Sequence, residues 1–454
     1  MKYKYLTNNK KKNKMSLKEN ERRKRGINMN KVTLENHNNF KKYFIVFICM
    51  VIQAIPFGIA QNIQPLFIPH VVSEFGFTLS GFSLIFTIGA LASSIASPIL
   101  GKLFGKVGIK TIFISGTMVS SFGFFMFSRS STLPEFYFWN AICQIGCIFF
   151  SALAVPYLIQ QWFPKKGRGK ALGIAFAGGS IGNVFLQQIT EHLLSHYGSS
   201  ITYAIFGVVS AIVSLPIILL FIRLPKEDEI NLNDDTVEED LKKLHIQEFE
   251  GLGVSENVKK PAFWIFGIGY AIVGISISAL STQYATYFTN GLNLPSAVVG
   301  ILGSLFAVFC LFGNVGGGVL FDKLGTLKTM TLSMILQSTA VIALLLAMNI
   351  KGLAYLYSIA YGLNVFSYMS APAFMATDLF GKKDSSVMLG FIQLFFAFGF
   401  AGGSTIFGLI VDKTGVFTTA WLVILACVVT GYVLLLTAIK MLKKDKRELI
   451  GHNK

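Results

Sequence analysis

Twelve long apolar segments constrain the fold of this chain more than any other feature of its sequence. Each is close to the roughly 20 apolar residues that an α-helix needs to cross a bilayer. They lie at residues 43–67, 80–101, 110–128, 136–161, 170–190, 201–222, 262–288, 297–320, 329–349, 353–378, 386–410 and 417–439. Backbone amides cannot stay unpaired in lipid, and the alternating pattern of a membrane barrel is absent. The segments therefore predict twelve transmembrane helices and an all-α membrane protein.

The charged residues are few and unevenly placed. Only 14% of the residues are charged, whereas soluble domains carry about 25%. Of the 40 Lys and Arg residues, only Arg129, Lys351 and Lys413 fall in loops of one predicted face. The positive-inside rule then predicts a multi-pass protein of the cell membrane with both termini in the cytoplasm.

The two halves of this pattern repeat at one offset of 217 residues, the distance from Gly101 to Gly318. The other matches are Lys106 with Lys323, Gly108 with Gly325, Phe163 with Phe380, Lys165 with Lys382, Lys166 with Lys383, Leu172 with Leu389, Gly173 with Gly390, Gly182 with Gly399 and Gly198 with Gly415. Two parallel six-helix halves in a membrane are the layout of a transporter whose halves rock about a central site.

Polar stretches divide the chain into five parts. We expect a basic disordered cytoplasmic tail at 1–42, a six-helix half at 43–223, a cytoplasmic linker at 224–260, a second six-helix half at 261–440 and a cytoplasmic tail at 441–454. The first tail has no apolar core followed by a cleavage site, so it is not a secretory signal, and we expect no nucleic-acid partner. Met15 and Met29 are alternative start positions to Met1.

A glycine-rich basic loop joins helices two and three and recurs between helices eight and nine. The copies read Gly101-Lys-Leu-Phe-Gly-Lys-Val-Gly108 and Gly318-Val-Leu-Phe-Asp-Lys-Leu-Gly325. They resemble the loop signature of the major facilitator superfamily, roughly G-x-x-x-D-K/R-x-G-R/K. The resemblance implies that Asp322 forms a latch that rocking breaks, whereas Gly105 stands where the first copy would carry its Asp. The predicted gating residues are Gly101, Lys106, Gly108, Asp322, Lys323 and Gly325.

A narrower resemblance lies between Trp162 and Gly182. This stretch, WFPKKGRGKALGIAFAGGSIG, is similar to the W-F-P-k-r-R-G-x-A-x-G-i-a-x-a-G-x-x-x-G pattern of the oxalate/formate antiporter and monocarboxylate porter branch. The resemblance implies a carboxylate-type solute. Members of that branch are thought to bind anions with cationic side chains, in helices eight and eleven of the oxalate antiporters and helix eight of the monocarboxylate porters. Here segments 297–320 and 386–410 contain no Lys or Arg, and offer Asn314 and Gln393 instead.

The resemblance also implies that helices one, four, seven and ten line a central cavity. Polar side chains at helical spacing follow one face of each of these segments. They are Gln53, Gln61 and Gln64 in the first, Asn140, Gln144, Cys147 and Ser151 in the fourth, Ser276, Gln283, Tyr284 and Tyr287 in the seventh, and Tyr357, Tyr361, Asn364 and Tyr368 in the tenth. Buried polar groups in lipid cost free energy unless they find partners or water, so these stripes favour a wet cavity.

A subset of these positions and one on helix eleven are the predicted solute contacts. They are Gln53, Gln61, Gln144, Tyr361, Asn364, Tyr368 and Gln393. The alternative is that these groups hydrogen-bond between helices, at roughly 0.6–2 kcal/mol each. Pro56, Pro156 and Pro372 predict places where helices one, four and ten bend. Amides, hydroxyls and aromatic rings favour a neutral, amphipathic or weakly charged organic solute over a small dianion.

Charged side chains are nearly absent from the apolar segments, which leaves the coupling ion open. Glu191 is the deepest acid, and it could carry a proton together with His192, as could His70. Proton symport, exchange and uniport remain alternatives. His192 and His196 have a metal-binding spacing but no third ligand, and the five cysteines all lie in apolar segments. We expect no metal and no cofactor.

The sequence therefore predicts a secondary active transporter of a small organic solute, with a carboxylate-type metabolite as the first expectation. Efflux of amphipathic or drug-like compounds is the alternative, and a transporter-like solute sensor is a weaker one. The chain has no Walker-type phosphate loop and assembles no catalytic constellation, so we predict neither an ATP-driven pump nor an enzyme. We expect a monomer whose partners are the bilayer, a small-molecule substrate and a coupling proton or exchanged anion.

Overall fold

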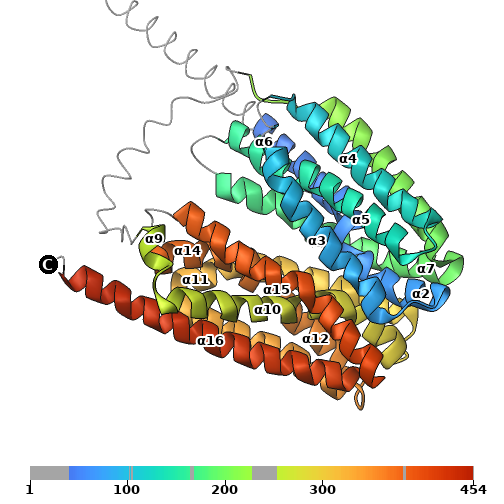
Figure 1. Cartoon of the computed structure of the whole chain (residues 1–454). Coiled ribbons are helices and arrows are strands. Elements are labelled where there is room, and N and C mark those ends of the chain that lie inside the picture. Colours follow the sequence, from blue (N-terminus) through green and yellow to red (C-terminus); the bar gives the residue numbers. More distant parts are fainter. Residues whose placement is uncertain are drawn as a thin grey trace, which may run out of the picture.

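The computed structural model describes residues 40–101, 103, 106–163, 168–226, 253–381 and 385–452. Nearly all of these residues are helical (Figure 1). The predicted tail up to residue 39, most of the linker, Gly105 and the lysine pairs at 165–166 and 382–383 lie outside the described residues.

The N-terminal half begins with a helical stretch from Phe40 to Phe75. Its elements are η1 (Gln53–Asn62), α2 (Gln64–Phe75), α3 (Leu79–Gly101), α4 (Ile109–Met126), η2 (Phe127–Arg129), α5 (Leu133–Ile148), η3 (Phe149–Leu153), α6 (Ala154–Trp162) and α7 (Arg168–Phe221). α7 holds two spanning helices that turn at Gly198, whose φ of +76° suits a residue without a side chain.

The C-terminal half follows the short helix α9 (Val254–Asn257). Its elements are α10 (Pro261–Thr286), η5 (Tyr287–Gly291), α11 (Ser296–Ala347), α12 (Leu353–Leu363), α13 (Phe366–Met369), α14 (Ala371–Phe380), α15 (Ser385–Thr414) and α16 (Phe417–His452). α11 is also double and turns at Gly325, where φ is +72°.

Nine stretches within the described ranges are long and apolar enough to span a bilayer, and α7 and α11 each contribute a double one. With the broken helix α12–α14, these give the twelve spanning helices that the sequence predicts. Large apolar side chains are exposed along them, including Leu220 (72% exposed) and Val315 (76% exposed). Apolar surfaces of this kind match lipid better than water.

The repeat that is visible in the sequence is also present in the helix packing. Gly182 of α7 packs on the first helix so closely that a Cβ there would lie 2.0 Å from the carbonyl oxygen of Ala54. Gly399 of α15 packs in the same way on α10, where a Cβ would lie 1.7 Å from the carbonyl oxygen of Ala271. Both members of the second contact lie 217 residues after those of the first. Small residues that let helix backbones touch therefore fix the same contact in each half.

Prolines bend three helices where the sequence predicts bends. The π-helix η1 surrounds Pro56, and the π-helix η3 ends shortly before Pro156. The tenth spanning helix is interrupted between α12 and α14, just before Pro372. A proline removes one backbone hydrogen bond and crowds the preceding turn, so the backbone locally leaves the α-helical pattern.

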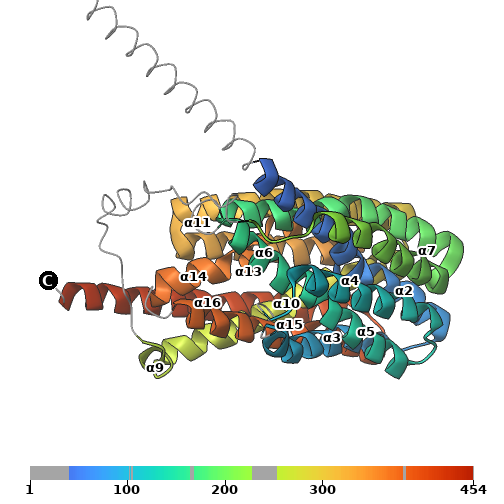
Figure 2. The ribbon, with the colours of Figure 1, turned by 90° about the horizontal axis from the view of Figure 1, so that it is seen from above.

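The two halves lie beside each other and diverge toward one side of the molecule (Figure 1). We call the side that carries Phe40 and the end of α16 the terminal side, and the opposite side, where α2 ends, the distal side. α7 contacts α11 along one seam, α3 contacts α15 along a second, and α2 contacts α10. In the view turned by 90°, the long helices of both halves run in the same general direction (Figure 2).

Candidate functional site

Within the described part of the chain, every hydrogen bond between the two halves lies in the distal part of the helices that it joins. These bonds link Asp412 with Leu79 and Ser80, Thr87 with Ala401 and Thr405, Gln283 with Ser83, Tyr284 with Gln187, and Ser304 with Val184 and Gln188. The helices of the two halves meet at this side and diverge toward the other. This conformation is therefore closed at the distal side and opens toward the terminal side.

The carboxylate of Asp412, at the distal end of α15, is bound at the start of α3 in the other half. The backbone N–H of Leu79 donates to Oδ1 at 3.0 Å, and that of Ser80 donates to Oδ2 at 2.8 Å. The first amides of a helix have no partner in their own helix, and the helix dipole favours an anion there. Gly408, one turn earlier, lets the backbones approach, since a Cβ on it would lie 2.7 Å from Ser80 Cα.

Replacing Asp412 with asparagine should weaken this contact and open the distal side more often. A carboxylate at an exposed helix start is worth about 0.3–1 kcal/mol, so the distal-closed population should fall roughly two- to fivefold. The distance between labels at Arg129 and Lys351, exposed distal positions of the two halves, reports this population. Glu135→Gln is the matched control, because that carboxylate accepts from Ser131 and Thr132 within its own half. An unchanged distance distribution in Asp412→Asn would contradict this role.

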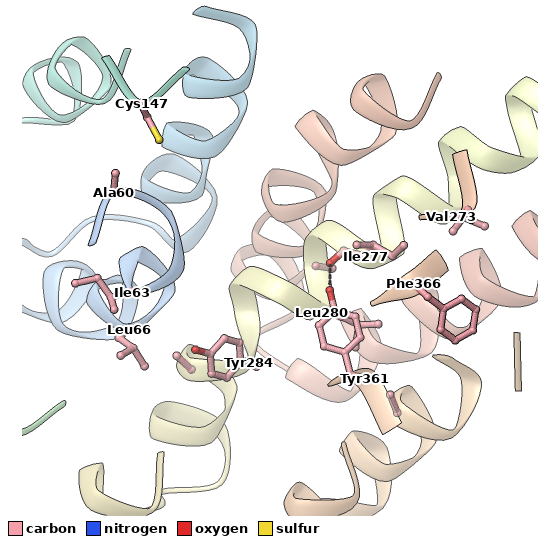
Figure 3. Close-up of a cluster of buried hydrophobic side chains, with 14 of the residues drawn as sticks. Ala60, Ile63, Leu66, Cys147, Val273, Ile277, Leu280, Tyr284, Tyr361 and Phe366 are labelled. Atoms are coloured by element: carbon pink, nitrogen blue, oxygen red, sulfur yellow. Dashed lines mark hydrogen bonds between the residues drawn. The ribbon is translucent and has the colours of Figure 1, made fainter. Parts of the chain in front are cut away.

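Two polar side chains of α10 complete the closure between the seams. Gln283 donates from Nε2 to Ser83 Oγ of α3 at 2.7 Å and to Ser404 Oγ of α15 at 2.9 Å. Tyr284 donates from its hydroxyl to Gln187 Oε1 of α7 at 3.0 Å. In Figure 3, Tyr284 lies between Leu66 of the N-terminal half and Leu280 of its own helix. Both side chains belong to the predicted stripe of helix seven, and they form the distal closure.

The predicted stripes of helices one and four face each other within the N-terminal half. Gln61 donates to Gln144 Oε1 and lies 3.9 Å from Cys147 Sγ. Elsewhere along the same pair of helices, Gln64 donates to Asn140 at 3.1 Å and Ser151 donates to Gln53 at 3.0 Å. Gln53 and Gln144 are buried, whereas Gln61 is exposed. Much of this stripe therefore joins helices, and Gln61 is the predicted contact that remains accessible.

The predicted residues on the tenth spanning helix are placed differently from one another. Asn364 is fully buried, accepts from Ser333 at 2.6 Å and donates to Gln337 at 3.1 Å. Gln337 also accepts from Tyr432, so the group links three helices inside the C-terminal half. Tyr361 is buried and donates to the carbonyl of Ile277 at 3.1 Å (Figure 3). In this conformation Asn364 and Tyr361 hold helices together.

Two further predicted contacts are more accessible. Tyr368 is half-buried and stacks on Phe396 of α15 with ring centroids 6.0 Å apart. Gln393 of α15 is exposed and lies about two turns toward the terminal side from Ala401. The structure therefore leaves Gln61, Tyr368 and Gln393 accessible, with Gln144 behind Gln61.

The loop motifs lie on the terminal side, where the halves diverge. Gly101 ends α3, Gly108 precedes α4, and Gly325 forms the turn inside α11. Lys106, Asp322 and Lys323 are exposed. Asp322 has no ion-pair partner in the described part of the chain, so in this open conformation the predicted latch is not engaged.

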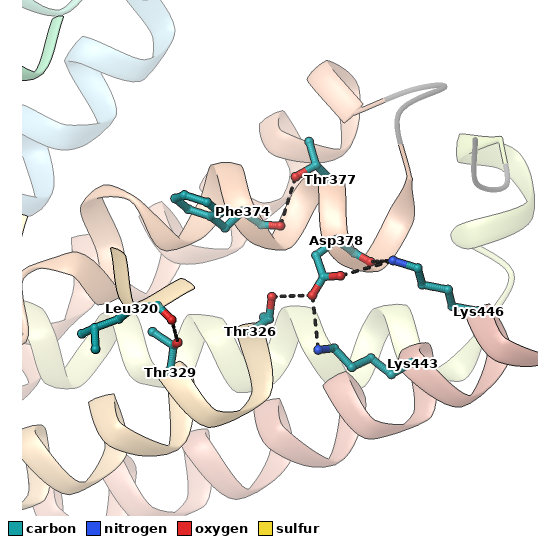
Figure 4. Close-up of polar contacts among 8 residues, drawn as sticks. All are labelled: Leu320, Thr326, Thr329, Phe374, Thr377, Asp378, Lys443 and Lys446. Atoms are coloured by element: carbon teal, nitrogen blue, oxygen red, sulfur yellow. Dashed lines mark hydrogen bonds and ion pairs between the residues drawn. The ribbon is translucent and has the colours of Figure 1, made fainter. Parts of the chain in front are cut away.

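A different acid organises the terminal side of the C-terminal half (Figure 4). Asp378 of α14 lies 3.3 Å from Lys443 and 3.2 Å from Lys446, both on α16. It also accepts from the hydroxyl of Thr326, next to the turn at Gly325, at 2.6 Å. This cluster fixes the ends of α14 and α16 to the α11 turn. The sequence suggested Asp378 only as part of a repeated loop, because its partner lysines lie more than 60 residues further along.

No group of three or more His, Cys, Asp or Glu side chains within the described ranges is placed to hold a metal ion. Four of the five cysteines are buried and the fifth is half-buried.

Comparison with known proteins adds the family. The model of the Major Facilitator Superfamily matches residues 46–373 and 266–452. YhjX of Escherichia coli, an uncharacterized MFS-type transporter, is 23% identical over 332 residues, which cover 71% of this chain and 77% of that protein. A bacterial homologue of the human lysosomal transporter Spinster, solved in an inward-facing and unoccupied conformation, superposes with a TM-score of 0.67 at 14% identity and covers 89% and 98% of the two chains. The nucleoside transporter NupG gives a TM-score of 0.67 at 15% identity, over 89% of this chain and 99% of that one.

Proposed function

The chain belongs to the major facilitator superfamily, and on that premise we propose that it is a secondary transporter that moves a small organic solute by alternating access. The observation that carries the proposal is the one-sided contact between the halves. Each half is tied internally by the same glycine contact, at Gly182 and at Gly399. The hydrogen bonds between the halves lie on the distal side throughout the described residues. Two rigid halves joined at one side can rock, so that a central site faces each side in turn.

We propose that the solute contacts Gln61, Tyr368 and Gln393, with Gln144 supporting Gln61. These side chains offer amide groups, a hydroxyl and aromatic faces on both halves. Helices eight and eleven contribute no Lys or Arg to this region. A monocarboxylate is the first candidate, because the stretch from Trp162 to Gly182 resembles the monocarboxylate porter branch. A small dianion would lack a counter-charge.

The orientation follows from the distribution of basic residues. If the terminal side is cytoplasmic, as the positive-inside rule predicts, the conformation described here is open to the cytoplasm. The Spinster homologue with the same fold is described as inward-facing. We propose a cell-membrane location with both termini inside.

Thermal stabilisation of the full-length protein in detergent tests the function and the solute class together. The panel contains monocarboxylates, dicarboxylates, nucleosides, organic cations and amphipathic drugs. A ligand at 100 times its dissociation constant should stabilise the fold by roughly 2.7 kcal/mol, which such a scan resolves. Uptake of the best ligand into proteoliposomes then tests transport. Stabilisation by amphipathic compounds alone would favour efflux, and stabilisation without uptake would favour a sensor.

Gln61→Ala should weaken binding of that ligand about 3- to 10-fold, because one hydrogen bond is worth roughly 0.5–1.5 kcal/mol. The readout is the ligand concentration at half-maximal stabilisation. Gln64→Ala is the matched control, since Gln64 lies on the next helical segment, is buried, and donates to Asn140. The control should lower the unfolding temperature and leave the affinity unchanged. Equal affinities in the wild type and Gln61→Ala would remove Gln61 from the site.

A further inference from the structure

Glu191 of α7 and His70 of α2 form a buried acid–base pair that no hydrogen bond satisfies. Glu191 is 1% exposed. Both of its carboxylate oxygens and His70 Nε2 are shielded from solvent and have no hydrogen-bond partner. His70 Nε2 and Glu191 Oε2 lie 3.7 Å apart, which suits an ion pair but is longer than a hydrogen bond.

The pair lies where the two halves meet on the distal side. A Cβ on Gly300 of α11, in the other half, would lie 3.5 Å from Glu191 Cβ, so the helices are in close contact there. Tyr284 of α10 donates to Gln187, one turn before Glu191. Burial of Glu191 therefore depends on the closed seam between α7 and α11, and separation of the halves would bring water to its carboxyl group.

The other titratable groups around the pair are accounted for. On α2, Glu74 already accepts a hydrogen bond from Ser199. On α10, Tyr284 is engaged with Gln187. On α7 itself, His192 and His196 stack on each other with ring centroids 4.2 Å apart. The α11 residues that line the adjacent cavity, Ser296, Ala297, Gly300 and Ile301, are not titratable.

The fully deprotonated pair does not suit this environment. It would leave a carboxylate buried beside a neutral imidazole, without a single donor, which is one of the most costly arrangements in a protein. One proton removes the difficulty in either of two ways. It makes Glu191 a neutral acid, or it makes His70 a cation that pairs with the carboxylate. Both forms hold one proton more than the deprotonated pair.

A path for that proton exists on the distal side. A cavity of about 360 Å³ lies at the α7–α11 seam and is lined by Glu191, His192, Ser195 and His196, among other residues. In water at neutral pH, a glutamic acid is ionised and a histidine is mostly neutral. Opening of the seam hydrates both groups and releases the proton.

We propose that Glu191 and His70 are a proton-binding site, occupied when the distal side is closed and emptied when it opens. This inference rests on the alternating access proposed above and names a proton as the ion that is linked to it. By linkage, a proton that binds only the closed conformation stabilises that conformation as the pH falls. For one linked proton, the ratio of closed to open molecules changes by up to tenfold per pH unit.

Labels at Arg129 and Lys351 of the full-length protein in lipid nanodiscs, without solute, test the site. The closed population of the wild type should grow as the pH is lowered from about 8 to about 5. Glu191→Gln should stay closed throughout this range, because glutamine has the shape of the protonated acid and cannot ionise. Glu74→Gln, an exposed acid on α2, is the control and should keep the wild-type response.

Infrared difference spectra provide a second readout that needs no folded variant for its first step. The wild type should show the band of a protonated carboxylic acid that is lost on raising the pH, and Glu191→Gln should lack it. A wild type without a pH response, or a response that persists in Glu191→Gln, would overturn the site. Because no solute is present, these outcomes do not depend on whether the proposed solute contacts are right.

Discussion

Gly399→Ala should strongly destabilise the folded protein, although it adds a single methyl group. The new Cβ would lie 1.7 Å from the carbonyl oxygen of Ala271, a backbone atom that cannot rotate away. Helices α10 and α15 would have to separate, and overpacking of this kind costs about 1–3 kcal/mol or more. We expect a large fall in unfolding temperature, in the yield of purified protein and in transport.

A neighbouring glycine supplies the control for this result. In Gly402→Ala, on the same helix, the new methyl group would meet only the end of the Ile406 side chain, at 3.5 Å. This variant should be as stable as the wild type, because alanine favours a helix more than glycine does. Equal stability of Gly399→Ala and Gly402→Ala would mean that α10 and α15 do not touch as described.

The same substitution at Gly408 should have a different outcome, because Gly408 packs between the halves. A Cβ there would lie 2.7 Å from the Cα and N of Ser80, on α3 of the other half. The two halves can relieve this clash by moving apart at the distal side, without unfolding either half. Gly408→Ala should therefore retain most of its thermal stability and shift the molecule strongly toward a distal-open conformation.

The distance between labels at Arg129 and Lys351 measures that shift. We expect the short-distance population to fall at least tenfold, which corresponds to about 1.4 kcal/mol and lies within the usual range for overpacking. Gly402→Ala again serves as the control, now with an unchanged distance. A Gly408→Ala variant that unfolds like Gly399→Ala would contradict the division of the molecule into two rigid halves.

The sequence predicted the fold in detail because the bilayer leaves few alternatives. The lengths of the apolar segments predicted the spanning helices, and three prolines predicted where helices bend. The repeated glycines at 182 and 399 marked positions where the structure has equivalent close contacts. These are local signals, since each depends on residues within one helix or on one position in a repeat.

The candidate site was less predictable because a helical stripe shows which face is polar but not what that face meets. The stripes of helices one and four were interpreted as a cavity wall, yet Gln53 and Gln64 pair with the opposing stripe. Asn364 is likewise bonded inside its own half. Asp412 and Asp378 were loop acids in the sequence, and their partners lie in helices that only the tertiary structure brings near.

The Asp412 contact also shows that the molecule is not symmetric where it closes. In the repeat, the counterpart of Asp412 is Ser195, and the counterparts of Leu79 and Ser80 are Ser296 and Ala297. These three residues line the cavity beside Glu191, so the second seam has an open space where the first has a carboxylate bound to a helix start. A perfectly twofold molecule would have to part both seams in a single event. Here the two seams have different chemistry, so one can give way before the other, and the passage between conformations has room for a half-unlocked intermediate.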